Sequence, residues 1–171
     1  MPDRIFILGG TRSGKSRHGR ERAQALGGDR VSFIATARPG DPELDARIAA
    51  HQADRPAAWQ TIEAEWDLSS AIARAPGANV LLIDSLTLWL SSAMERSASP
   101  RDLWRSAQEA LLPRRAPVVI VSDEIGLGIV PLDASTRAFR DELGWLHQEV
   151  AGWAAEVTFM VAGIATRLKG G

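Results

Sequence analysis

The residues with the clearest chemical potential lie near the start of the chain, in the segment Gly9 to Ser16. It matches the phosphate-binding pattern G-x-x-x-x-G-K-[ST]. Glycines let several backbone N–H groups turn toward one anion, and a following helix adds a favourable dipole. Lys15 is suited to neutralise the β- and γ-phosphates of a nucleotide, and Ser16 to bind Mg²⁺. We predict a P-loop, with an ordinary glycine-rich turn as the alternative; its expected nucleotide contacts are Gly9, Gly10, Thr11, Arg12, Ser13, Gly14, Lys15 and Ser16.

A second candidate is the carboxylate of Asp84, which directly follows the apolar run Val80 to Ile83. Four apolar residues that end in an acid are typical of a Walker B strand. At the C-terminal end of a strand next to the first one, such a carboxylate is well placed to hold Mg²⁺. The alternative is that Asp84 only caps the helix that follows. Because the P-loop pattern is also present, we favour the metal role.

The third candidate is a basic stripe that contains a histidine. Arg47, His51 and Arg55 follow one another at intervals of four residues, so on a helix they share one face. Two flanking guanidinium groups disfavour protonation of the imidazole, which leaves a neutral nitrogen free to attack or to accept a proton. The same arginines could hold a polyphosphate. Alternatively, His51 only borders the packing face that Leu44 and Ile48 begin, and the spacing leaves both interpretations open.

Carboxylates and glycines also follow a later apolar run, in the segment Ser122 to Pro131. At the C-terminal edge of a parallel sheet such residues lie where ligands bind in open α/β folds. The spacing Asp123-x-x-Gly126 is similar to a GTPase switch, but the chain has no Asn/Thr-Lys-x-Asp motif to read a guanine base, which argues against a signalling GTPase. A plain turn is the alternative.

These candidates need elements that bring them together, and the apolar pattern predicts such elements. Continuous apolar runs are typical of strands buried on both faces. They occur at Ile5–Leu8, Val31–Ala35, Val80–Ile83, Val118–Val121 and Val157–Val161, with segments of helical character between them. This βαβα pattern predicts an α/β fold of three layers, with a mostly parallel central sheet flanked by helices.

The longest helix is expected from about Asp133 to about Glu156, after Pro131 and with Asp133 as its N-cap. Its apolar residues recur at helical spacing, so that one stripe faces the sheet: Phe139, Leu143, Leu146, Val150 and Trp153. Other histidines, His18 and His147, are expected to be structural or solvated.

Two further helices are expected, one from near Pro42 to before Pro56 and one after Asp84. The segment Trp59 to Glu63 is a short edge strand or irregular, and Ser97 to Pro100 is the best loop candidate in the middle of the chain.

Length and composition narrow the class of protein. A chain of 171 residues is expected to form one domain, residues 1–171, and without cysteines it has no disulfides. Its 20 basic and 21 acidic residues argue against a nucleic-acid binder. Apolar runs of about four residues fall far short of the roughly 20 that cross a bilayer, and no signal-peptide core precedes Gly9, so we expect a cytoplasmic protein.

Together these residues resemble one family, the bifunctional adenosylcobinamide kinase/adenosylcobinamide-phosphate guanylyltransferases of cobalamin biosynthesis. The likeness covers nearly the whole chain. It rests on five ordered blocks: Gly9 to His18, Ile34 to Ala37, Ala46 to Trp59, Asp84 to Leu90 and Glu124 to Pro131. The third and fifth blocks are far more specific than a bare P-loop.

The resemblance implies a RecA-like P-loop fold and two successive reactions at one nucleotide site. ATP or GTP would phosphorylate adenosylcobinamide. GTP would then transfer GMP through a guanylyl-histidine to adenosylcobinamide phosphate, which gives adenosylcobinamide-GDP. By motif position that histidine is His51, which acts beside Lys15. Some members of the family are homotrimers, so a homo-oligomer is expected. The remaining site residues that we expect are Arg47, Arg55, Glu63 and Asp84 for the nucleotide, and Ser16 and Asp84 for Mg²⁺.

The chain departs from the family pattern at a few positions. Ser85 stands where many members have Cys, Asp123 where Asn is common, and Ala58 where a His can occur. Pro42 interrupts an acidic approach to its helix. None of these removes a proposed catalytic group. Two alternatives stay open: a P-loop kinase of another small alcohol, with His51 structural, and a nucleotide-dependent regulatory module without transfer chemistry.

Overall fold

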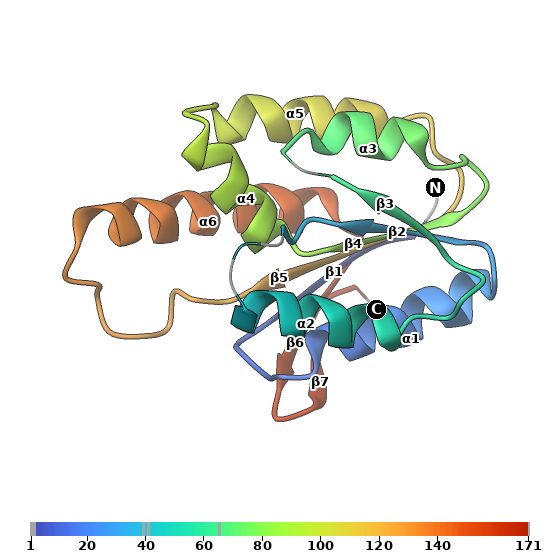
Figure 1. Cartoon of the computed structure of the whole chain (residues 1–171), viewed down its shortest axis with the longest axis horizontal. Coiled ribbons are helices and arrows are strands. Elements are labelled where there is room, and N and C mark those ends of the chain that lie inside the picture. The colour runs from blue at the N-terminus through green and yellow to red at the C-terminus, as the bar shows by residue number, and fades with distance from the viewer. Residues whose placement is uncertain (1–2, 39, 41, 65, 171) are drawn as a thin grey trace.

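A computed structural model describes residues 3–38, 40, 42–64 and 66–170, except for the side chains of Glu43, Leu44, Arg47 and His51 (Figure 1). The strands of this part are β1 (Arg4–Gly9), β2 (Val31–Ala35), β3 (Gln60–Glu63), β4 (Val80–Asp84), β5 (Val118–Asp123), β6 (Glu156–Val161) and β7 (Ile164–Lys169). The helices are α1 (Lys15–Gly27), α2 (Pro42–Ala53), α3 (Leu68–Arg74), α4 (Leu86–Glu95), α5 (Pro100–Leu111) and α6 (Ala134–Trp153).

The described strands form one sheet in the order β3-β2-β4-β5-β1-β6-β7. Its pairs are parallel except for β6 with β7, which are antiparallel. Helices α1 and α2 lie on one side of the sheet and α3 to α6 lie on the other (Figure 1). The expected three-layer α/β fold with a mostly parallel sheet is therefore confirmed.

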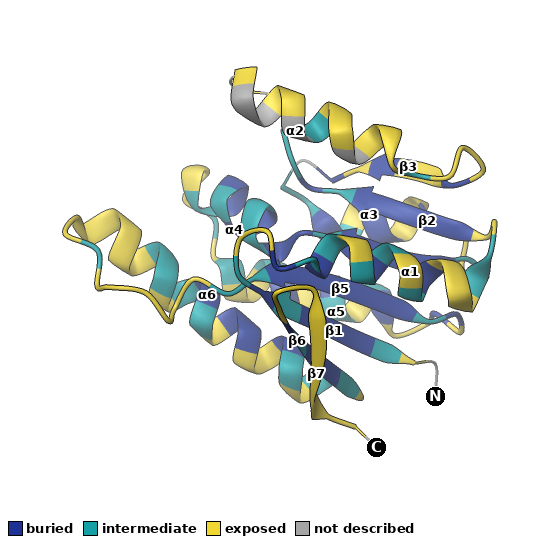
Figure 2. Cartoon of the chain, turned by 90° about the horizontal axis from the view of Figure 1, so that it is seen from below, coloured by how far each residue is buried: buried dark blue, intermediate teal, exposed yellow. Residues whose placement is uncertain are grey.

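Buried side chains fill the space on both faces of the sheet. Successive residues of a strand point to opposite faces: in β1, Ile5 and Ile7 pack on the α1 side, while Phe6 packs with α3 to α6. Figure 2 shows the inner strands as buried and β7 as exposed. Burial on both faces explains why the inner strands read as continuous apolar runs.

Most of the elements expected from the sequence are present. The five apolar runs correspond to β1, β2, β4, β5 and β6, and β3 is the short edge strand. Asp133 caps α6 by accepting a hydrogen bond from the Thr136 N–H at 2.7 Å. The predicted stripe of α6 is buried or partly buried against the core.

Three elements were not anticipated. β7 is exposed along its whole length, so it has no apolar run, and α3 is only seven residues long. The third is α5. The prediction of a loop from Ser97 to Pro100 is wrong at its end, because Pro100 begins this helix. Ser99 caps that helix by accepting a hydrogen bond from the Asp102 N–H, and proline is well tolerated in the first turn.

A buried arginine joins two connecting segments at the N-terminal edge of the sheet. The guanidinium of Arg114 donates to the carbonyl oxygens of Ala75, Pro76 and Asn79 at 3.1, 3.1 and 2.6 Å. These contacts fix the segment before β4 against the segment before β5.

The helices give no sign of a membrane-crossing segment. Within the part of the chain that the structure describes, none is long and apolar enough to span a bilayer.

Candidate active site

The loop between β1 and α1 has the strand–loop–helix setting that a P-loop requires. Gly14 adopts a left-handed conformation with φ of 92° just before α1, which glycine adopts at little cost. A Cβ at Gly9 would approach the Ser13 Oγ to 2.4 Å and the Met160 carbonyl to 2.9 Å. Both glycines are thus required by the backbone geometry.

Lys15 lies folded back over this loop and is only 8% exposed. Its Nζ donates to the Gly10 carbonyl at 3.2 Å and forms an ion pair with Asp123 Oδ1. Nearby, the Ser13 hydroxyl is buried and has no hydrogen-bond partner among the described residues. A phosphate in the loop would give the Ser13 hydroxyl the acceptor that a buried donor needs, and would offer Lys15 a further one.

A hairpin near the C-terminus contacts the loop between β1 and α1 and holds it in place. The β6–β7 hairpin turns at Ala162 and Gly163, both with positive φ, and the Gly163 N–H donates to the Ser13 carbonyl at 2.9 Å. Sequence reasoning missed this support because the exposed β7 carries no strand pattern.

Two acidic residues end neighbouring strands at the same edge of the sheet as the loop. In the register of the strands, Asp84 of β4 lies opposite Val121 of β5, and Asp123 of β5 lies opposite Gly9 of β1. The expectation that the Asp84 strand is next to the first strand is therefore wrong, because β5 is inserted between them. The carboxylate that contacts Lys15 is accordingly Asp123.

In the sequence, Asp123 was one of the acidic residues of the segment Ser122 to Pro131 and was not predicted to contact Lys15. The available signal was that it closely follows a buried apolar run, as Asp84 does. Its contact with Lys15 depends on the order of the strands, which no local pattern encodes.

The segment after Asp84 is fixed by a side chain from the neighbouring strand end. The Thr36 hydroxyl donates to the Ser85 carbonyl at 2.7 Å and accepts from the Ser85 N–H at 2.8 Å. Thr36 follows β2, which pairs with β4. This contact fixes the backbone beside the Asp84 carboxylate.

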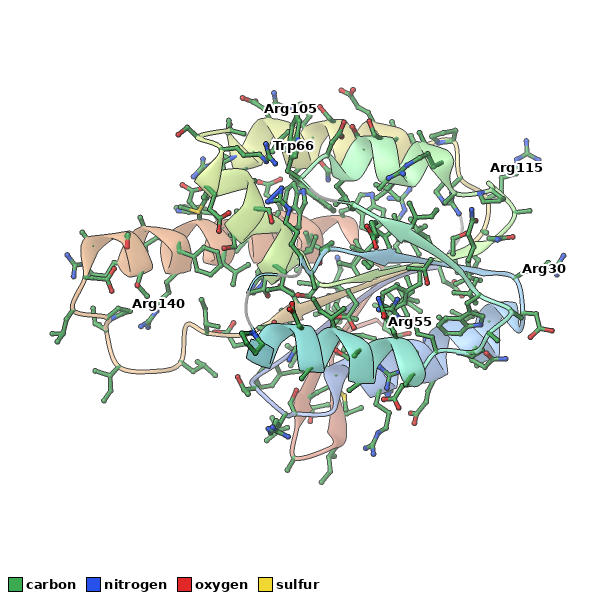
Figure 3. All side chains as sticks on the ribbon, in the orientation of Figure 1. Arg30, Arg55, Trp66, Arg105, Arg115 and Arg140 are labelled. Carbon is green, nitrogen blue, oxygen red and sulfur yellow. The ribbon has the colours of Figure 1, made fainter. Side chains whose placement is uncertain are left out.

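Helix α2 carries two of the expected site residues, Arg47 and His51, whose side chains lie outside the described part. The helix ends at Ala53, so the expectation that Arg55 shares its face is wrong. The guanidinium of Arg55 instead stacks on the ring of Phe33, 3.7 Å from its centroid. Figure 3 shows Arg55 on the side of the sheet that α1 and α2 cover.

The environment of Arg55 also connects it to the carboxylate of β4. Burial lowers the pKa of Arg55, and the nearby negative charge of Asp84 partly opposes that shift. The segment that follows α2 is further tied to α1 by an ion pair of Arg20 with Asp54 at 3.0 Å. The C-terminal end of α2 is thus held on the α1 side of the sheet.

Glu63 ends the edge strand β3 and is exposed. Its position is opposite Ala35 of β2, which in turn lies opposite Asp84 of β4. The three strand ends are therefore aligned. Glu63 lies on the same edge of the sheet as the P-loop, but β2, β4 and β5 separate its strand from β1.

A chain of hydrogen bonds fixes the C-terminal end of β5. His147 of α6 is buried and contacts the Ser122 hydroxyl through Nε2 at 2.8 Å. Ser122 lies 3.1 Å from the Thr87 hydroxyl, which accepts the Asp123 N–H at 2.8 Å. Burial lowers the pKa of His147, although Glu124, 3.8 Å from Nδ1, and Asp123 oppose the shift. His147 therefore has the structural environment that the sequence suggested as one option.

The donor atoms at this edge are suited to a hard cation. Ser16 and Asp84 offer a hydroxyl and a carboxylate, which are oxygen ligands of the kind that Mg²⁺ prefers. No cluster of three or more His, Cys, Asp or Glu side chains suited to hold a metal occurs in the described residues. The arrangement can bind a nucleotide polyphosphate and activate it for transfer.

Comparison with known sequences gives extended matches. A family model described as cobinamide kinase / cobinamide phosphate guanyltransferase matches residues 5–168. The bifunctional adenosylcobalamin biosynthesis protein CobP of Pseudomonas aeruginosa is 46% identical over 174 residues, 98% of each chain. The bifunctional adenosylcobalamin biosynthesis protein CobU of Salmonella typhimurium is 37% identical over 183 residues, 96% of this chain and 99% of that one.

Comparison with solved structures supports the same fold at low sequence identity. The flagellar accessory protein FlaH from Methanocaldococcus jannaschii matches 97% of this chain and 77% of its own, with a TM-score of 0.53 and 13% identity. The type III secretion ATPase EscN from enteropathogenic Escherichia coli matches 94% of this chain and 43% of its own, with a TM-score of 0.56 and 14% identity. At these identities the likeness concerns the fold alone.

Proposed function

The chain belongs to the cobinamide kinase / cobinamide phosphate guanyltransferase family, and we propose that a single nucleotide site on the P-loop serves both reactions. It is a bifunctional cobinamide kinase and guanylyltransferase of cobalamin biosynthesis. Residues 1–171 act as one nucleotide-binding domain in the cytoplasm. The observation that carries the proposal is the buried ammonium of Lys15 inside a glycine-rich loop.

In the kinase reaction, Lys15 and the backbone N–H groups of the P-loop hold the β- and γ-phosphates of ATP or GTP. The hydroxyl oxygen of the aminopropanol arm of adenosylcobinamide bonds to the γ-phosphorus, and the bond from that phosphorus to the bridging oxygen breaks. The proton of the hydroxyl passes to a carboxylate at the sheet edge, for which Asp84 and Glu124 are the candidates. Lys15 stabilises the charge that develops on the phosphates.

In the guanylyltransferase reaction, His51 acts as the nucleophile. A neutral imidazole nitrogen bonds to the α-phosphorus of GTP, and pyrophosphate leaves. The resulting phosphoramidate is labile enough for a phosphate oxygen of adenosylcobinamide phosphate to displace the imidazole, which gives adenosylcobinamide-GDP. Arg47 and Arg55 neutralise the phosphates, while Glu63 contacts the nucleoside at the far end of the sheet edge.

Mg²⁺ completes the site in this proposal. Ser16 and Asp84 would hold it, and when bound it neutralises negative charge on the phosphates. The hard oxygen character of both groups supports the assignment.

A labelling experiment tests the histidine. Incubation with α-labelled GTP and Mg²⁺ is expected to leave an acid-labile, alkali-stable label on the wild-type protein and none on His51→Ala. His18→Gln, which removes a histidine from α1, is the matched control and should keep the label. If His51→Ala is labelled as strongly as wild type, another group is the nucleophile.

A kinase assay on the same variants separates the remaining alternatives. His51→Ala should still phosphorylate adenosylcobinamide, because the P-loop is intact. A chain that phosphorylates a different small alcohol and never becomes labelled would be a kinase only. A chain that binds nucleotide without either transfer would be a regulatory module.

We also propose that the chain forms a homo-oligomer, a trimer by analogy with family members. The support is the loop after β5, in which Leu127, Ile129 and Leu132 are 83, 96 and 99% exposed. The loop is braced from α6: Arg137 donates to the carbonyl oxygens of Pro131 and Leu132, and Arg140 to those of Gly126 and Ile129. Figure 3 shows Arg140 near the start of α6, beside this loop. A braced loop with outward apolar side chains is suited to contact a second copy.

A further inference from the structure

The charge of the P-loop lysine is already paired in this structure. Lys15 Nζ contacts Asp123 Oδ1, and both side chains are largely shielded, at 10% and 27% exposed. The ammonium also donates to the neutral Gly10 carbonyl at 3.2 Å. A triphosphate that uses Lys15 must therefore share or displace the carboxylate. Partial burial makes such an ion pair stronger than one at the surface.

The position of Asp123 is fixed rather than free to drift away. Its backbone lies opposite Gly9 in the sheet, and its N–H is bonded to the Thr87 hydroxyl at 2.8 Å. The hydroxyl of Thr87 can donate to Ser122, and Ser122 to Nε2 of a neutral His147. Every donor in this chain then has an acceptor, so the network favours one backbone position for Asp123.

We propose that Asp123 sets the affinity of the site for polyphosphates, by positioning Lys15 in the empty site and competing with the terminal phosphates for its ammonium group. The inference rests on the proposed nucleotide function of the P-loop. A displaced Asp123 carboxylate stays at the sheet edge near the phosphates and repels them. An asparagine at this position would hold Lys15 through its amide oxygen without that negative charge.

The test measures binding before chemistry. Isothermal titration with Mg²⁺ and a GTP analogue that has a methylene between the α- and β-phosphates reports the dissociation constant without guanylyl transfer. Asp123→Asn, which is nearly isosteric, is expected to lower that constant by roughly three- to thirtyfold. GMP, which lacks the terminal phosphates, should bind to wild type and to Asp123→Asn with the same dissociation constant. For inorganic tripolyphosphate, which has only phosphates, Asp123→Asn should lower the dissociation constant by the same factor as for the analogue.

Two controls separate local competition from a general change in charge. Glu21→Gln removes the same charge from α1, but Glu21 pairs with Arg17 at 3.8 Å and not with Lys15. It should leave the dissociation constants unchanged. In a Lys15→Ala background, Asp123→Asn should no longer improve binding to the same extent, because the contested ammonium is gone.

Several outcomes would overturn the inference. Unchanged or weaker analogue binding by Asp123→Asn, an equal gain with Glu21→Gln, or an equal gain with GMP would each do so. If wild type binds neither the analogue nor tripolyphosphate, the proposed nucleotide function fails as well, and that result is distinct from a wild type that binds but ignores the substitution.

Discussion

Lys15 is the residue on which the chemistry of the P-loop depends most directly. We expect Lys15→Ala to abolish phosphoryl transfer. Each charge-assisted hydrogen bond lost in the transition state costs roughly 1.5 to 3 kcal/mol, or about one to two decades in rate. Turnover of adenosylcobinamide with ATP measures the effect. Lys169→Ala, at the exposed end of β7, is the control, and near-normal turnover in Lys15→Ala would contradict the assignment.

At the scale of residues, local sequence patterns predicted which side chains lie at the edge of the sheet. They did not predict contacts between residues that are far apart in the sequence. The P-loop glycines and Asp84 could be found because their spacing follows backbone geometry. The Lys15–Asp123 pair could not, because strand order decides which acid faces the lysine. Arg55 was placed on a helix that ends two residues earlier, at Ala53.

Among the elements, α6 contributes a buried histidine whose ionisation should affect folding. Burial lowers the pKa of His147 below its ordinary 6.5, so below about pH 6.5 the unfolded chain binds a proton that the folded chain does not. The contribution of His147 to stability is therefore fully present above about pH 6.5 and is lost as the pH falls toward the lower pKa of the folded state.

Urea unfolding at about pH 7.5 and about pH 5.5 checks this expectation. One such group changes the free energy of unfolding by at most about 1.4 kcal/mol per pH unit. His147→Gln should weaken the pH dependence, whatever its effect on absolute stability. An equally steep dependence in the variant would assign it to other groups.

A second prediction at this scale concerns the connections to β4 and β5. Arg114→Met leaves the carbonyl oxygens of Ala75, Pro76 and Asn79 without their donor. We expect unfolding in urea to show a loss of about 2 to 4 kcal/mol. The control Arg115→Met changes the exposed neighbour, which points away from the body (Figure 3), and should cost little. Equal stabilities for the two variants would refute the role of Arg114.

The elements that the sequence predicted are those with a strong burial signal. Inner strands and the stripe of α6 must be apolar because they are covered, whereas β7 is exposed and leaves no such mark. Helix α5 was missed although Trp104, Ala107 and Leu111 have helical spacing and are buried. Its Pro100 was interpreted as part of a loop rather than as the first residue of a helix.

For the whole molecule, the apolar loop after β5 predicts self-association. Replacing both Leu127 and Ile129 with Ser should shift the mass measured by light scattering toward the monomer, because a contact between copies would lose apolar area. The matched control is Leu112→Ser, an exposed leucine just after α5, which should leave the mass unchanged. A double variant with unchanged mass would exclude the loop as the interface.

The brace between Ser13 and Gly163 has a consequence for how the protein is made. During synthesis the phosphate loop leaves the ribosome long before the hairpin that fixes its carbonyl. Until that hairpin docks, the loop lacks one of the contacts that define its shape. A nascent chain stalled before β6 should therefore bind nucleotide less tightly than the finished one.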